Sequence, residues 1–320
     1  MAVDDDCHHI GGQAVIEGVI MRNGDVYGLA VRSPGGGIIA RRLPWFSLTS
    51  VPLLNKPFLR GFPILLETLV NGIQALNRSA EISAEDAEDP LSTGQLLLAV
   101  AAALLLAVGL FVAAPHLLSL IMLYLGLGGD LEGISFHLWD GFFKCCIFVG
   151  YIKLISCAKD VRRVFQYHGA EHKIIHAFEA GGEITAALAG RMSRLHPRCG
   201  TTFLLFVICI SIILHAVVLP LLLALHTPQN AVVKHALIIF VKLLLIVPIS
   251  ALAYELIRHA ARLPEGLHAA FLRAPGLMLQ RLTTYEPDSG QLDVALVALR
   301  EALGEEEGAS VRTAPYTTIG

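Results

Sequence analysis

The sequence predicts a mainly α-helical, polytopic membrane protein with about four transmembrane helices, a small N-terminal β-hairpin segment and a cytoplasmic helical C-terminal tail. Composition is the first reason: 54% of the 320 residues are apolar and only 16% are charged, which is unusual for a soluble domain. The second reason is clustering, because no Asp, Glu, Lys or Arg occurs between Asp89 and Asp130. A net charge of -3 gives no reason to expect nucleic acid as a partner.

Residues 1–94 are the predicted N-terminal cytoplasmic segment. In residues 26–43 two short runs of β-forming residues flank a Pro-Gly turn, which predicts a hairpin. Residues 58–79 place apolar groups at helical spacing with three charged residues among them. This pattern predicts an amphipathic helix that lies in the membrane interface or packs on the bundle. Whether it enters the membrane is left open.

Residues 95–258 form the predicted transmembrane region. Its helices approach the ~20 apolar residues that a bilayer requires, although the second and the fourth carry charged residues. The predicted helices cover residues 96–114, 134–158, part of the uncharged tract 199–233, and 236–257.

Lysine and arginine counts orient these helices. Seven occur before residue 95, seven in the loop 159–200 and six after residue 257, whereas the two remaining connections hold none and one. By the positive-inside rule, both termini and the loop 159–200 are predicted to be cytoplasmic. The sequence therefore predicts a multi-pass protein of the cell (inner) membrane, with the lipid bilayer as its first partner.

Residues 259–320 are the predicted cytoplasmic tail. Two amphipathic segments, residues 264–284 and 288–303, predict two helices separated by a short connection. Asp288 can cap the second helix, with Gln291 at the third helical position.

The loop 159–200 begins with the first group of residues suited to chemistry. His168, His172 and His176 recur every four residues and form one stripe if the second membrane helix continues through them, with Glu171 beside the stripe. The pattern His168-x-x-Glu171-His172 matches a zinc motif in which two imidazoles hold the metal and the carboxylate acts on a bound water. Histidines at this spacing are also common on a solvated helix face, so the pattern alone does not decide.

A second group stands immediately before the third predicted span. His196 and Cys199 are three residues apart, a spacing that suits a metal clip. A helix-capping loop with an incidental thiol explains the same residues equally well. In a reducing compartment we do not expect the six cysteines to form structural disulfides.

Two carboxylates are weaker candidates for a further ligand or an orienting group. Glu255 lies at the cytoplasmic end of the fourth span, where it can equally pair with Arg258. Glu17 lies among glycines, in a segment that an ordinary turn and strand also explains. The predicted topology brings the histidine stripe, the His196–Cys199 pair and Glu255 to the same membrane face, and that topology was derived without these residues.

Three sequence motifs, GGQAVIEGVIMR, YHGAEHK and HPRCGT, make the chain resemble the YqhQ-like family of bacterial membrane proteins. The resemblance extends from Gly11 to about Leu303, with departures at Ile20 and Tyr285. It implies a polytopic membrane protein with a metal-dependent enzyme site, and it supplies no substrate. The motif positions carried over are Glu17, His168, Glu171, His172, His196 and Cys199.

The leading hypothesis is a membrane-embedded, metal-dependent hydrolase that acts on a lipid-linked or peptide substrate at the cytoplasmic face. A divalent metal, with zinc favoured, would be held by His168, His172, His196 and Cys199, with Glu171 as general base. Glu17, Glu255 and His176 would be further ligands or orienting groups. The rival hypothesis is a non-catalytic scaffold, channel or transporter subunit with a structural metal or a hydrogen-bonded cluster, and a pore would require a homo-oligomer.

Overall fold

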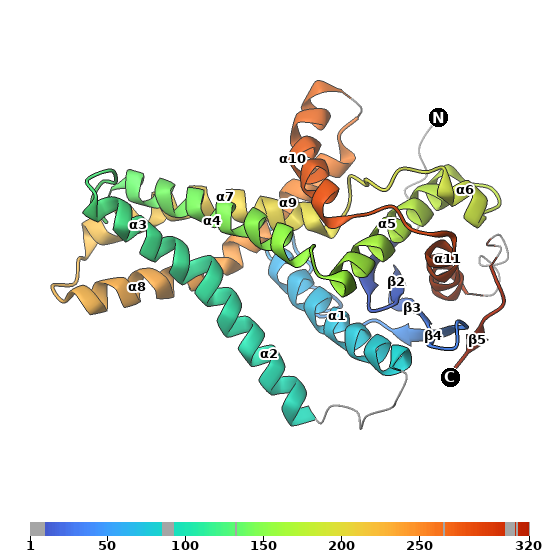
Figure 1. The fold of residues 1–320 in the computed structure, drawn as a ribbon. Helices are drawn as coiled ribbons and strands as arrows, with labels where there is room; N and C mark the ends of the chain where they lie inside the picture. Colours follow the sequence, from blue (N-terminus) through green and yellow to red (C-terminus); the bar gives the residue numbers. More distant parts are fainter. Residues whose placement is uncertain are drawn as a thin grey trace.

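A computed structural model describes residues 10–84, 93–131, 133–264, 266–304, 311 and 313–319. Figure 1 shows two parts, a β-sheet covered by helices and a group of long helices that extends away from it. We call the first part, formed by the sheet with helices α1, α5, α6 and α11, the head. The second part, α2 to α4 with α7 to α10, we call the bundle.

The head is built on one five-stranded sheet in which every neighbouring pair is consecutive in sequence. The first four strands form an antiparallel meander, and the fifth pairs in parallel with the fourth. The strands are β1 (Gly11–Val15), β2 (Gly18–Asn23), β3 (Val26–Arg32), β4 (Ile38–Pro44) and β5 (Thr317–Thr318).

The predicted hairpin is confirmed as β3 and β4, but the sheet is larger than expected. The sequence offered a turn and strand around Glu17 only as an alternative, and β2 is hard to recognise because both of its faces are covered. Val19 and Met21 face one apolar core while Ile20 faces another. A strand buried on both faces lacks the alternation of apolar and polar residues by which half-buried strands are recognised.

Helices from distant parts of the chain cover the two faces of the sheet (Figure 1). One apolar core joins the sheet to α5 (Lys159–Ala180) and α11 (Ser289–Leu303), and a second core lies on the α1 side (Gly61–Ser83). The predicted capping box is present, with Asp288 and Gln291 bonding reciprocally at the start of α11. The short helix α6 (Ala186–Gly190) also borders this core. Parts of all three predicted ranges, 1–94, 95–258 and 259–320, therefore contribute to the head.

The bundle contains the segments that are long and apolar enough to cross a membrane. Within the described ranges, three segments meet that test, and a fourth does if the bent pair of α4 and α5 counts as one span. The three are 97–124, 200–225 and 231–262. Their elements are α2 (Thr93–Val108), the π-helical turn η1 (Gly109–Ala113), α3 (Ala114–Tyr124), α4 (Ile134–Ile155), α7 (Gly200–Leu225), α8 (Ala231–Leu244) and α9 (Ile246–Arg262), followed by α10 (Leu267–Thr283).

The structure corrects the expectation that the histidine stripe lies on a straight continuation of the second span. Helix α4 ends at Ile155, and α5 begins at Lys159 at an angle of 100° to it. The bend lays α5 on the sheet, where Ala170 and Ile174 are buried in the core of the head. Burying this apolar stripe stabilises the bent arrangement, while a straight helix would leave it in water.

The bundle buries three charged side chains among its apolar helices. Asp140 on α4 lies 2.5 Å from the Lys242 Nζ on α8 and 3.6 Å from the Lys144 Nζ. The Lys144 Nζ is also 3.4 Å from the His215 Nδ1 on α7. Since an unpaired charge is costly in an apolar environment, these contacts tie α4, α7 and α8 together.

Candidate metal centre

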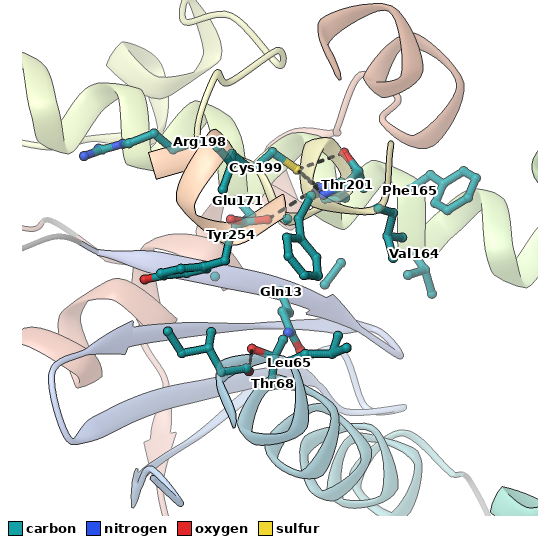
Figure 2. Close-up of a pocket in the computed structure, with 18 residues that line it drawn as sticks. Gln13, Leu65, Thr68, Val164, Phe165, Glu171, Arg198, Cys199, Thr201 and Tyr254 are labelled. Atoms are coloured by element: carbon teal, nitrogen blue, oxygen red, sulfur yellow. Dashed lines mark hydrogen bonds and ion pairs between the residues drawn. The ribbon is translucent and has the colours of Figure 1, made fainter. Parts of the chain in front are cut away.

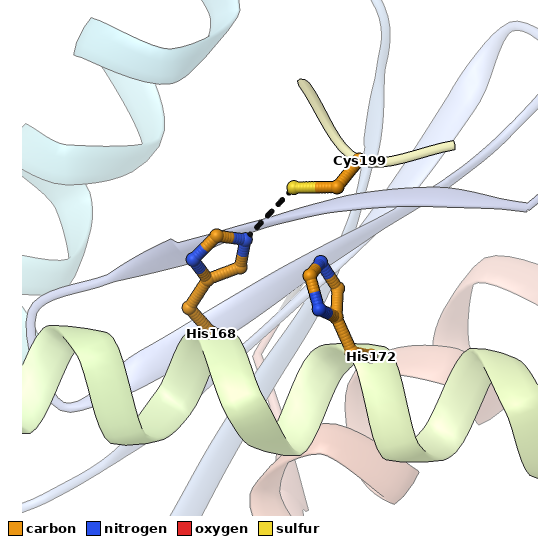
Figure 3. A group of neighbouring side chains, drawn as sticks. All are labelled: His168, His172 and Cys199. Carbon is orange, nitrogen blue, oxygen red and sulfur yellow. Dashed lines mark hydrogen bonds between the residues drawn. The ribbon is translucent and has the colours of Figure 1, made fainter. Parts of the chain in front are cut away.

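His168, His172 and Cys199 bring three metal-ligating atoms together at the head end of the bundle (Figure 3). Both histidines lie on α5, one turn apart, with ring centres separated by 4.4 Å. Cys199 precedes α7, and its Sγ lies 3.2 Å from the Nε2 of His168. One ligand atom from each residue lies within 4.8 Å of the others. The structure thus brings Cys199, from the second predicted group, next to His168 and His172 of the histidine stripe.

Backbone carbonyls hold both rings in a defined tautomer. The Nδ1 of His168 is 2.9 Å from the Thr283 carbonyl oxygen, and the Nδ1 of His172 is 2.6 Å from that of Arg194. A carbonyl oxygen only accepts, so each Nδ1 carries a proton, and in the neutral ring the Nε2 keeps its lone pair. This is the arrangement by which proteins orient metal-ligating histidines.

His172 supplies the most informative atom of the group. Its Nε2 is buried and has no hydrogen-bond partner among the described residues. Burial, together with the neighbouring His168, holds the pKa of His172 well below its usual value, so the ring is neutral. A neutral, buried nitrogen without a partner is unfavourable unless something binds it, and a metal ion would do so.

Glu171 lies beside these donors and is itself buried. Burial raises its pKa to about 8, and its Oε2 lies 3.8 Å from the Nε2 of His168. Gly12 on β1 makes room for it, because a Cβ at that position would stand 2.7 Å from the Glu171 Cγ. Gly12 therefore makes room for Glu171, a connection that the sequence did not reveal.

Cys199 is placed by its position at the start of a helix. It is the N-cap residue of α7, and its Sγ accepts from the Thr201 backbone N–H at 3.4 Å. Burial raises the pKa of the Cys199 thiol. The capping role proposed as the alternative is therefore present, and it coexists with the contact to His168.

His196 falls outside the group of three donors, although its ring centre lies 5.8 Å from that of His172. His196 and His176 form a second group with Glu179, and the His196 Nε2 lies 3.2 Å from the Glu179 Oε1. Glu179 also forms an ion pair with Arg198, and the His176 Nε2 donates to the Leu195 carbonyl at 2.9 Å. These contacts fasten the loop before Cys199 to α5.

The two weaker carboxylate candidates both have arginine partners. Glu17 lies in the turn between β1 and β2, where it pairs with Arg163 and accepts from Tyr167 at 3.2 Å. The hydrogen bond from Arg163 lowers the pKa of Glu17. Glu255 accepts two hydrogen bonds of 2.7 Å from Arg60. Neither belongs to either potential metal-binding group among the described residues.

Three of the candidate residues face a cavity of about 510 Å³ (Figure 2). His168, Glu171 and Cys199 line it on one side, and β1, α1, α7 and α9 supply much of the rest. The lining of this cavity is largely apolar and includes Leu65 and Phe203. A ligand in this cavity would contact the three polar groups from an environment that contains little water.

Several positioning residues were missed by the sequence analysis. Gln280 on α10 holds both backbone groups of His196, accepting at 2.8 Å and donating at 2.8 Å. Arg194 donates to the carbonyl of Thr284, next to the Thr283 carbonyl that holds His168. The only available signal was the motif LTTYEP, which lies in the same stretch of sequence.

The fold and this site define a protein with a helical bundle, a small sheet and a three-donor His/Cys group on the wall of an apolar cavity. The chain belongs to the family described as "Protein of unknown function (DUF1385)", whose model matches residues 56–305. It is 31% identical over 309 residues to the Bacillus subtilis (strain 168) protein described as "Uncharacterized protein YqhQ", covering 92% of each chain. No solved structure matches it. The expected family resemblance is confirmed.

Proposed function

We propose that the protein is a membrane-embedded, metal-dependent hydrolase with a zinc-like site at the cytoplasmic face of the inner membrane. The observation that carries the proposal is the buried Nε2 of His172, which has no partner among the described residues and lies in one group with the Nε2 of His168 and the Sγ of Cys199. In the proposed topology the apolar helices of the bundle are inserted in the bilayer and both termini are cytoplasmic.

The donor set fits a zinc ion. Two imidazoles and a thiolate are ligands that zinc accepts, and the Nδ1 atoms are already occupied by carbonyls. Three protein ligands are typical of catalytic zinc, whereas structural zinc has four. In the catalytic case the bound ion would lower the pKa of a coordinated water to about 7.

Glu171 is the proposed general base of the site. Its carboxyl group faces the same cavity as His168 and Cys199. Burial raises the pKa of this carboxyl group, and a bound cation would lower it again, so that the carboxylate could accept a proton from a coordinated water. The apolar lining would limit the access of bulk water to it.

The proposed substrate is a lipid-linked molecule or a membrane peptide. The cavity is lined by the start of α7 and by the later part of α9, both of which belong to apolar segments long enough to span a membrane. A substrate that resides in the bilayer would meet an apolar cavity at that depth. The large exposed apolar residues along the bundle also favour membrane insertion.

Elemental analysis of the purified full-length protein tests the metal assignment. We expect a stoichiometric metal in the wild type and a loss of most of it in His172→Ala, since removing a buried ligand weakens binding strongly. The matched control is His259→Ala, at an exposed position on α9 outside both groups. A full metal complement in His172→Ala would overturn the ligand assignment, and a fourth protein ligand in a metal-loaded structure would favour a structural role.

A further inference from the structure

A second cavity adjoins the candidate metal centre and has the opposite chemical character. Its volume is about 460 Å³, and four arginines line it. They are Arg60, Arg198, Arg258 and Arg262. No aspartate or glutamate occurs among the described residues that line it. We call this the arginine cavity and the one beside His168 the apolar cavity.

The arginine cavity keeps a net positive charge after its ion pairs are counted. Glu255 pairs with Arg60, and Glu179 pairs with Arg198. Among the described residues, a charge of about two remains even with both carboxylates subtracted from the four guanidinium groups. Arginine presents planar donors that match the oxygens of a phosphate group. The chemistry of this cavity therefore favours a phosphate group over a neutral polar group.

The two cavities share part of their walls. Arg198, Tyr254 and Ile257 line both of them. Arg198 is separated by one peptide bond from Cys199, so a molecule that reaches from one cavity into the other passes beside the candidate metal centre. Together the two cavities offer a charged compartment and an apolar compartment at one site.

The loop before α1 places apolar side chains beside the arginine cavity. Asn55 of this loop lines the cavity, and Val51, Leu53, Phe58 and Leu59 around it are between 50% and 61% exposed. Large exposed apolar side chains next to cationic groups are typical of segments that lie in the interfacial zone of a bilayer. Lipid headgroups occupy that zone, which is where an amphiphile would enter.

We propose that the site binds an amphiphile with a phosphate-bearing headgroup, its phosphate in the arginine cavity and its hydrocarbon chain in the apolar cavity. This proposal rests on the proposed function because it names the substrate class of the same site. A membrane phospholipid and a phosphorylated lipid carrier share this chemistry. A free inorganic phosphate would fill only one of the two cavities.

Binding to the full-length protein in detergent at physiological salt tests the proposal. The probes are dihexanoyl phosphatidic acid, the matched neutral dihexanoylglycerol and inorganic phosphate. We expect the phosphatidic acid to bind at least about tenfold more tightly than either other probe, since one charged hydrogen bond alone contributes about 1.4 kcal/mol or more. Equal binding of inorganic phosphate, or of the neutral lipid, would overturn the proposal.

Paired variants separate a built site from general attraction between charges. Arg258→Gln with Arg262→Gln removes two arginines of the cavity and should weaken phosphatidic acid binding by about tenfold. The control, Lys159→Gln with Arg281→Gln, removes the same charge at exposed positions outside both cavities and should leave affinity unchanged. Equal losses in the two pairs would overturn the proposal. If the first pair does not fold, the single Arg262→Gln variant at its exposed position replaces it.

The two proposals can fail separately. Phosphatidic acid binding is measured on metal-free protein, so its result does not depend on a metal at His172. Selective binding without any stoichiometric metal would support the amphiphile site and contradict the hydrolase. A stoichiometric metal without selective phosphatidic acid binding would support the metal assignment and contradict the amphiphile site.

Discussion

Gly12 determines how closely the sheet approaches the candidate general base. A Cβ at this position would lie 2.7 Å from the Glu171 Cγ and 2.8 Å from its Oε1. Glu171 is buried and has little room to move, so the clash would shift β1 or the carboxyl group. The close approach of strand and helix therefore depends on the absence of one methyl group.

We predict that Gly12→Ala lowers the stability of the protein by about 1 to 3 kcal/mol, the usual cost of an overpacked core. The neighbouring substitution Gly11→Ala is the control, because a Cβ there meets no atom within 4 Å. Thermal unfolding of both variants in detergent measures the difference. Equal melting temperatures for the two variants would contradict the packing described here.

The side chains that the structure groups around His168 were easier to propose from the sequence than the groups that hold them. His168, Glu171, His172 and Cys199 have side chains whose chemistry is visible in the sequence, and the four-residue spacing on one helix brings two of them together. Thr283 contributes only a backbone carbonyl, which every residue possesses. No pattern in side chains could have identified it.

Helix α1 is anchored by one buried carboxylate. The Glu67 Oε1 accepts from the backbone N–H groups of Leu48 and Thr49, both at 2.6 Å, and from the hydroxyls of Ser47 and Thr49. Burial acts to raise the pKa of Glu67, but these hydrogen bonds outweigh it and hold the pKa below the usual 4.5. The predicted helix over residues 58–79 is confirmed, while this anchor to the preceding loop was not predicted.

The pH dependence of stability should report this anchor. A depressed pKa means that Glu67 stabilises the fold above pH 4.5 and that this contribution is lost as pH falls through the folded-state value. We predict that Glu67→Gln lowers stability by about 1 to 2 kcal/mol at pH 7 and by less near pH 3. Thermal unfolding across this range measures the effect, with the exposed Glu81→Gln on the same helix as control. A cost that does not change with pH would contradict the assignment.

The long apolar segments were predictable from hydropathy, but the angles between the helices were not. The 100° bend between α4 and α5 follows from which surface α5 buries, and that surface includes strands β1 and β2, which the sequence suggested only as an alternative around Glu17. Because the predicted sheet was too small, the surface on which α5 packs was not recognised. The direction of α5, which carries the histidines, was therefore predicted wrongly.

The head joins the beginning and the end of the chain around one core. Helix α11 lies against β2 and β3, and its residues from Val294 to Leu299 are fully buried. A Cβ at Gly28 on β3 would lie 2.3 Å from the Ala298 carbonyl oxygen, so this glycine sets the separation of helix and sheet. The C-terminal helix is thus part of the core of the head, which the predicted division into ranges did not anticipate.

Gly28→Ala should loosen α11 from the sheet. We predict a loss of about 1 to 3 kcal/mol in stability and faster proteolytic cleavage within residues 289–303. Gly35→Ala, in the turn between β3 and β4, has no atom within 4 Å of its added Cβ and serves as the control. Limited proteolysis with mass spectrometry would locate the cleavage. An unchanged cleavage rate in Gly28→Ala would show that the sheet yields to the added methyl group.

The carbonyl of Thr283 that orients His168 lies 115 residues further along the chain. A ribosome has therefore synthesised most of the protein, including every apolar helix of the bundle, before this hydrogen bond can form. The ring of His168 cannot reach its final orientation while the chain is still being synthesised. A nascent or truncated chain would thus hold the histidines and the cysteine without their final alignment.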